Sequence, residues 1–186
     1  MAVLVTGASG LVGRAWCARA AAGGAEVRRM VRRPPSAAGE FRWDPAGGEF
    51  DDRALDGCTA VVHLAGESVA GGRWTAGRKR RVRDSRVLGT GLLAARIAAA
   101  PAPPRVLVCA SAVGYYGDRG EEELDEAAGR GAGFLAETCA EWEEAAAPAA
   151  GAGVRLGHPR HGGGLARAGG ALGKVPPACR VGPGGP

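Results

Sequence analysis

Three glycines near the start of the chain, Gly7, Gly10 and Gly13, have the spacing of a phosphate-binding turn. They follow a buried-strand pattern at residues 3–5 and precede a helix-favouring run from Leu11. The first glycine suits the tight turn, the second leaves room for a ligand at the backbone, and the third lets helix and strand pack closely. The alternative is an ordinary strand-turn-helix whose glycines serve packing alone. The residues expected to hold a dinucleotide's pyrophosphate, beside the helix amides that favour an anion, are Gly7, Ser9, Gly10, Leu11, Val12 and Gly13.

Two arginines follow the second predicted strand, Glu26 to Val31. In a parallel sheet this carboxyl end meets the adenosine ribose of a dinucleotide. An acidic residue there binds the 2′-hydroxyl of NAD, whereas a guanidinium suits the 2′-phosphate of NADP. Arg32 and Arg33 therefore favour NADP(H) over NAD(H). The alternative is that they form a solvated charge pair before the prolines.

The elements that must position these residues alternate between strand and helix. Strands are predicted at 60–66, 105–110 and from 154, and long helices at 75–100 and 134–147. Residues 36–57 are predicted to be an irregular connection with a short helical turn near 51–55. Repeated βα units with short turns predict an α/β fold of the Rossmann type, a doubly wound parallel sheet with helices on both faces.

Length, charge and cysteine usage narrow the class of protein. The 186 residues suffice for one such domain, and the net charge of +5 suits an anionic cofactor without arguing for nucleic acid. The basic run at 78–83 has no interleaved aromatic residues on which bases stack, so no nucleic-acid partner is expected. Five scattered cysteines favour a reducing cytosol over a disulfide framework. No signal peptide or membrane-spanning run is present, so we expect a cytoplasmic protein without a membrane partner.

The last thirty residues depart from the alternating pattern. Residues 157–186 are rich in glycine and proline and leave little room for strand or helix. We therefore divide the chain into a dinucleotide-binding domain at 1–156 and a tail at 157–186, which is either a mobile arm or the start of a lobe that is absent.

Five segments together resemble a known family. They are TGASGLVG at 6–13, HLAGESVAGGRW at 63–74, DSRVLGT at 84–90, SAVGYYGDRG at 111–120 and FLAETCAEWE at 134–143. The combination resembles the NAD(P)-dependent epimerase/dehydratase family, and within it the atypical short-chain dehydrogenases called epimerase family proteins. The resemblance implies an NADP(H)-binding domain in which Leu64, Ala65 and Gly66 lie on the nicotinamide-ribose side. It also implies that Arg86 contacts the cofactor, the alternative being one more exposed arginine on a basic helix.

The chain lacks the acid/base pair of active short-chain dehydrogenases. Those enzymes use a tyrosine with a lysine four residues later, and here Leu135 and Cys139 occupy these positions. Ser111 and Tyr115, with Tyr116 beside them, are the replacements we consider, against the alternative that their hydroxyls only close a loop. No metal site is expected, because the three histidines lack ligand neighbours at suitable spacing.

These observations leave two function classes open. The first is an NADP(H)-dependent epimerase or oxidoreductase with an unknown small-molecule substrate. The second is a dinucleotide-binding sensor or interaction protein without chemistry of its own. The family's C-terminal substrate lobe is missing from this sequence, so the resemblance implies a C-terminally truncated member, and a decayed copy with neither function is a third interpretation.

Overall fold

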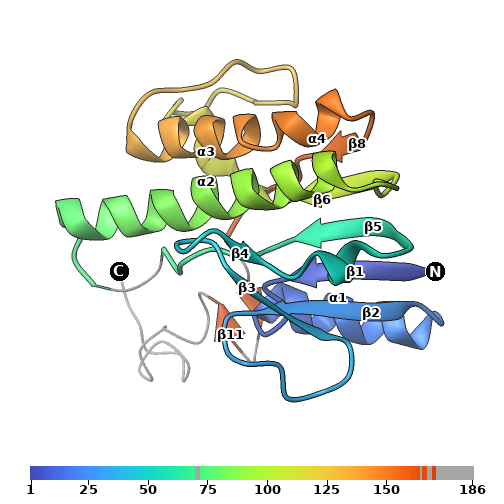
Figure 1. The fold of residues 1–186 in the computed structure, drawn as a ribbon. Helices are drawn as coiled ribbons and strands as arrows, with labels where there is room; N and C mark the ends of the chain where they lie inside the picture. The colour runs from blue at the N-terminus through green and yellow to red at the C-terminus, as the bar shows by residue number, and fades with distance from the viewer. Residues whose placement is uncertain (70–71, 164, 167–168, 171–186) are drawn as a thin grey trace.

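A seven-stranded sheet forms the centre of the computed structural model, which describes residues 1–69, 72–163, 165–166 and 169–170 (Figure 1). The strand order is β4-β3-β2-β1-β5-β6-β8, and all neighbours are parallel except β3 and β4. The strands are β1 Ala2–Thr6, β2 Glu26–Val31, β3 Glu40–Asp44, β4 Glu49–Phe50, β5 Cys58–His63, β6 Val106–Cys109 and β8 Arg155–Gly157. Chain order reverses at β1, which has β2 on one side and β5 on the other, so the switch point of the sheet lies between β1 and β5.

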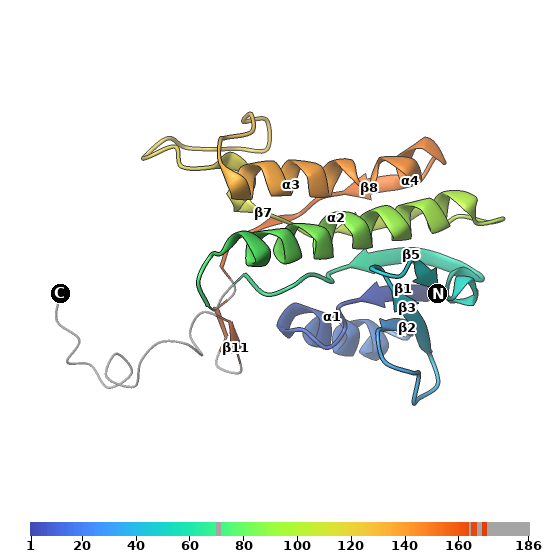
Figure 2. The same cartoon turned by 60° about the vertical axis from the view of Figure 1, so that its left-hand side comes forward.

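Helices cover both faces of this sheet. One face carries α1, and the other carries α2, α3 and α4 (Figures 1 and 2). The helices are α1 Leu11–Ala22, α2 Ala76–Ala99, α3 Phe134–Glu144 and α4 Ala147–Gly151, with 3-10 turns η1 Asp52–Leu55 and η2 Val113–Tyr116. None of the helices in the described residues is long and apolar enough to cross a lipid bilayer.

The core explains why the strands and helices take these positions. All five residues of β1 are buried, as expected for a central parallel strand covered on both faces. Leu93 and Ile97 of α2 are fully buried and pack in one cluster with Leu4, Leu107 and Trp142. Helix α2 begins where the Thr75 hydroxyl accepts a hydrogen bond from the backbone N–H of Arg78. The doubly wound parallel sheet with helices on both faces is therefore confirmed.

Two local predictions were wrong. The connection at 36–57 contains η1 as expected, but it also forms the edge hairpin β3–β4. The tail was expected to leave little room for strand or helix, yet β9 Arg160–His161 pairs with β7 Ser111–Ala112. Beyond it, β10 Leu165–Ala166 and β11 Gly169–Gly170 form a short antiparallel pair. The predicted mobility of residues 164, 167–168 and 171–186 lies outside the described residues.

The predicted helix at 134–147 is divided in the structure. Helix α3 ends at Glu144, and α4 begins at Ala147 with a proline in its first turn. The strands predicted at 3–5, 26–31, 60–66, 105–110 and from 154, and the helices predicted from residue 11 and at 75–100, lie within three residues of the observed bounds.

Candidate functional site

The glycine turn brings the carboxyl ends of β1 and β5 against the start of α1. Gly7 has φ +67°, and a Cβ there would lie 2.7 Å from the carbonyl carbon of Leu64. A Cβ on Gly13 would lie 2.2 Å from the carbonyl oxygen of Gly7. Only glycine fits at both positions, which holds strand, loop and helix in close contact. Gly10 is the N-cap of α1 and supplies no side chain to that helix end, which leaves its first amides open to an anion.

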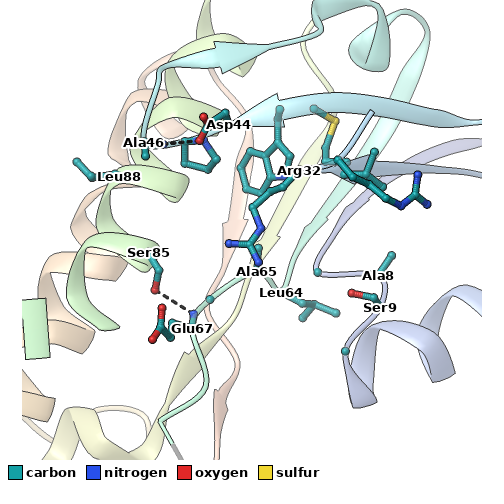
Figure 3. A pocket seen from close by; sticks show the side chains of 18 of the residues that line it. Ala8, Ser9, Arg32, Asp44, Ala46, Leu64, Ala65, Glu67, Ser85 and Leu88 are labelled. Carbon is teal, nitrogen blue, oxygen red and sulfur yellow. Dashed lines mark hydrogen bonds between the residues drawn. The ribbon is translucent and has the colours of Figure 1, made fainter. Parts of the chain in front are cut away.

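A cavity of about 1040 Å³ opens beside this turn. Its walls are the carboxyl ends of β1, β2, β3 and β5 together with one side of α2 (Figure 3). Predicted site residues that line it are Gly7, Ser9, Gly10, Arg32, Arg33, Leu64, Ala65 and Gly66. Leu11, Val12, Gly13 and Arg86 are not among the residues that line it. The volume is at the upper end for ligand pockets and suits an extended molecule such as a dinucleotide.

Two further walls of the cavity were missed from the sequence. One is the end of β3, with Trp43, Asp44 and Pro45, and the other is the side of α2 that includes Ser85 and Leu88. Asp44 accepts a hydrogen bond from the N–H of Ala46, as Figure 3 shows. Trp43, Asp44 and Pro45, at the end of β3, belong to the predicted connection at 36–57, and without β3 nothing in the sequence placed them beside the glycine turn.

The two arginines at the end of β2 differ in their surroundings. Arg33 donates to both carboxylate oxygens of Glu40, at 2.7 and 2.8 Å. These bonds, helped by the N–H of Ser36, lower the pKa of Glu40 to about 2. Arg32 is exposed and has no hydrogen-bond or ion-pair partner in the described part of the chain. Of the pair, Arg32 is therefore the guanidinium open to a ligand.

A buried histidine, His63, directly precedes the residues at the end of β5 that line the cavity. The Thr6 hydroxyl accepts from the backbone N–H groups of Leu64 and Ala65, both at 3.2 Å, so its own proton points to Nδ1 of His63 at 2.6 Å. The His63 ring is fully buried and meets Trp43 edge-on at 6.0 Å between centroids. Burial lowers the pKa of His63 to about 4, so the ring is neutral.

The candidate catalytic hydroxyl of Ser111 is part of a closed polar cluster. Ser111 is buried and donates to Glu143 at 2.6 Å. Arg160 donates to both oxygens of the same carboxylate, each at 2.9 Å. Burial tends to raise the pKa of Glu143, but the bonds from Arg160 and Ser111 hold it below its ordinary value. The Ser111 proton is thus engaged with a carboxylate that resists protonation.

The two tyrosines of η2 take different roles beside this cluster. Tyr116 is buried and its hydroxyl accepts a hydrogen bond from Arg160 at 2.9 Å. The Arg160 guanidinium also lies over the Tyr115 ring, 3.5 Å from its centroid. The Tyr115 hydroxyl has no partner among the described residues, which leaves it as the one open hydroxyl of the cluster.

Other candidate sites find no support in the described residues. No group of three or more histidine, cysteine, aspartate or glutamate side chains is placed to hold a metal ion there. The basic run on α2 is partly engaged locally, since Arg78 lies over Trp74, Lys79 lies over Phe134 and Arg83 pairs with Glu141.

A sheet with this strand order, a glycine turn at its switch point and a large cavity beside it define a Rossmann-type dinucleotide-binding domain. The family model described as the NAD dependent epimerase/dehydratase family matches residues 3–133, so the chain belongs to that family. This finding confirms the resemblance seen in the sequence motifs.

Named relatives agree with this assignment. An epimerase family protein of Mycobacterium bovis is 43% identical over 97% of this chain and 59% of its own length. The crystal structure of human epimerase family protein SDR39U1 with NADPH is 34% identical, has a TM-score of 0.84 and covers 100% of this chain and 62% of the human chain. A nucleoside-diphosphate sugar epimerase structure from Corynebacterium glutamicum is 41% identical with a TM-score of 0.80, over 93% of this chain and 36% of that one. The chain spans 55–62% of the length of the curated relatives it matches.

Proposed function

We propose that this chain binds NADP(H), with the pyrophosphate at the glycine turn and the 2′-phosphate at Arg32. The observation that carries the proposal is the contrast between the two arginines: Arg33 is held by Glu40, whereas Arg32 lines the same cavity without a partner. A guanidinium is the side chain best suited to a phosphate. The NADPH in the human relative's structure supports the same cofactor.

The remaining cavity residues fit the other parts of the cofactor. Gly7 and Gly10 would let the pyrophosphate approach the backbone at the start of α1, and Leu64 and Ala65 would lie on the nicotinamide-ribose side. The bound nicotinamide would supply or accept a hydride. We further propose that residues 1–156 form the cofactor domain and that residues 157–186 begin a substrate lobe, with β9 packed on the cofactor domain.

Two classes of function follow from cofactor binding. In the first, the protein is an epimerase or oxidoreductase that acts on an unknown small molecule, and Tyr115 supplies the open hydroxyl. In the second, it binds the dinucleotide without chemistry. The closed state of Ser111, which donates to Glu143, and of Tyr116, which accepts from Arg160, favours the second class. A loss of NADPH absorbance during incubation with a panel of carbonyl compounds would support the first class.

Calorimetry with NADPH and NADH tests the cofactor proposal. We expect Arg32→Met to weaken NADPH binding by about tenfold to a hundredfold, the range of a hydrogen bond to a charged group, and to leave NADH binding within about twofold. Arg33→Met is the matched control, one residue away, and should change NADPH binding less than Arg32→Met. Equal loss for the two cofactors in Arg32→Met, or the larger loss in Arg33→Met, would contradict the assignment.

A further inference from the structure

The loop that follows β5 is held at both ends by side chains from other elements. Residues 64–68 line the cavity in succession and have no regular secondary structure. The Thr6 hydroxyl fixes the first two backbone N–H groups of the loop. At the other end, Ser85 Oγ accepts from the N–H of Glu67 at 2.9 Å, the bond drawn in Figure 3. Arg86 Nη1 donates to the carbonyl oxygen of the same Glu67 at 3.1 Å. Both backbone groups of one loop residue are therefore bound by one Ser-Arg pair on α2.

The Arg86 side chain is itself fixed. Its Nη1 also donates to the carbonyl oxygen of Val82 at 2.9 Å, and its guanidinium lies 5.1 Å from the ring centroid of Trp142. Burial lowers the pKa of Arg86 from its ordinary value. A side chain held between a helix carbonyl and a core indole presents its N–H groups in one direction, so it acts on the loop as a rigid support.

Gly66 fits the loop against this support. A Cβ at position 66 would lie 3.3 Å from Cζ of Arg86 and 3.5 Å from both Cγ and Nη1. The distance to Cζ is tighter than ordinary van der Waals contact, so a side chain at position 66 would require the guanidinium or the loop to shift by a few tenths of an ångström. The absence of a side chain at Gly66 and the presence of Arg86 behind it are thus linked.

The placement of Arg86 differs from that of a residue that touches a cofactor phosphate. Asp84, Ser85 and Leu88 of the same helix line the cavity, whereas Arg86 does not. Its Nη1 is engaged with protein carbonyls on the far side of the loop wall. The Nη1 group of Arg86 is therefore used to hold residue 67 of the loop.

We propose that Ser85 and Arg86 are positioning residues for cofactor binding, which act by clamping the N–H and C=O of Glu67 and so fix the shape of loop 64–68. This inference rests on the proposed NADP(H) binding. It assigns the Ser-Arg pair a role in building the cavity wall, distinct from the phosphate contact assigned to Arg32.

Amide hydrogen exchange of the cofactor-free protein and NADPH calorimetry test the clamp together. Arg86→Met keeps an unbranched side chain against Trp142, and Arg80→Met, at an exposed position of the same helix, is the control. We expect Arg86→Met to speed exchange in loop 64–68 and to weaken NADPH binding about tenfold, while the salt dependence of binding stays that of the wild type. Ser85→Ala should speed exchange of the Glu67 amide in particular. Arg80→Met should change neither quantity.

A double-mutant cycle between Gly66 and Arg86 tests the linkage directly. Gly66→Ala should weaken NADPH binding in the wild type and have no further effect in Arg86→Ala, because the obstructing guanidinium is gone. Unchanged loop exchange in Arg86→Met, with weaker binding and a flatter salt dependence, would overturn the clamp and assign Arg86 to a phosphate. Absence of NADPH binding by the wild type would overturn the proposed function instead, and loop exchange would still decide whether the clamp exists.

Discussion

The two halves of the sheet treat their polar groups in opposite ways. Around the ends of β1 and β2, Gly10 provides no capping side chain at the start of α1 and Arg32 has no partner among the described residues, and both residues line one cavity. Around β6, the Ser111 hydroxyl, the Glu143 carboxylate and three nitrogens of Arg160 are all engaged with one another or with Tyr116. The first region leaves hydrogen-bonding capacity for a ligand, and the second uses its capacity within the protein.

This contrast separates binding from chemistry in the chain. Unpaired donors at a cavity cost little free energy because water can hydrogen-bond to them. They form stronger, charge-assisted hydrogen bonds when an anion binds. A cluster whose members are mutually satisfied stabilises the β7–β9 pairing and gains little from a ligand. We therefore expect substitutions of the groups that line the cavity to change affinity and substitutions in the second region to change stability.

We expect the largest effects, on stability and on NADPH affinity, from substitutions in the glycine turn. In Gly13→Val the side chain would start 2.2 Å from the Gly7 carbonyl oxygen, so we expect a loss of about 4 kcal/mol or more in the free energy of unfolding. At Gly10 a Cβ would meet only that same oxygen, at 3.3 Å. Gly10→Val should therefore fold, yet bind NADPH at least about a hundredfold more weakly, because its side chain blocks the phosphate. Urea unfolding and calorimetry on both variants check this, and normal affinity in Gly10→Val would place the pyrophosphate elsewhere.

The next largest effect is a pH dependence of stability that we expect from the buried His63. The pKa of His63 is about 4 in the folded protein and 6.5 in its ordinary state, so the unfolded chain binds more protons between these values. Stability should therefore fall as the pH drops from 6.5 to 4, with His63 contributing on the order of 3 kcal/mol. Urea unfolding across this range should show a shallower loss in His63→Gln than in the wild type. His161→Gln, at an exposed position, is the control and should keep the wild-type profile.

A smaller loss of stability is expected from the closed cluster. Glu143→Gln leaves the Arg160 guanidinium without its carboxylate, and we expect a loss of about 2 kcal/mol, below the value for a fully buried pair because both side chains keep 16–19% exposure. Glu141 is on α3 like Glu143, and Glu141→Gln breaks its exposed pair with Arg83 of α2, which should cost less than about 1 kcal/mol. NADPH affinity should not change in either variant. A loss of affinity in Glu143→Gln without a loss of stability would break the contrast between the two regions.

The sequence could predict those elements that are determined by interactions between residues close together in the chain. The strand patterns of β1, β2, β5 and β6 and the glycine turn can be recognised in the local sequence, and they predict the sheet and the pyrophosphate site. The sequence of β3 is EFRWD, and because it mixes polar and apolar residues it was predicted as part of an irregular connection. The loss of β3 from the prediction also removed one wall of the cavity.

The hydrogen-bond partners of the candidate site residues could not be predicted, because the fold brings them together from separate elements. Arg32 and Arg33 are equivalent in the sequence, and the distinction between them depends on Glu40, which lies opposite only once β3 pairs with β2. In the same way, Ser111 is 32 residues from Glu143, and Arg160 lay in a segment whose glycines and prolines predicted no structure. The absent tyrosine-lysine pair could be read from the sequence, but the engagement of the remaining hydroxyls could not.

The smallest effects distinguish the two neighbouring tyrosines. Tyr116→Phe removes the acceptor of an Arg160 N–H inside the cluster, and we expect it to cost about 1 kcal/mol of stability. Tyr115→Phe keeps the ring under the Arg160 guanidinium and removes a hydroxyl without a partner in the described chain, so stability should change by less than about 0.5 kcal/mol. Urea unfolding of both variants measures the difference. Equal losses would show that the Tyr115 hydroxyl belongs to the closed cluster. If a carbonyl substrate is found, loss of turnover in Tyr115→Phe at unchanged stability and NADPH affinity would make this hydroxyl the proton donor, and unchanged turnover would remove it from the chemistry.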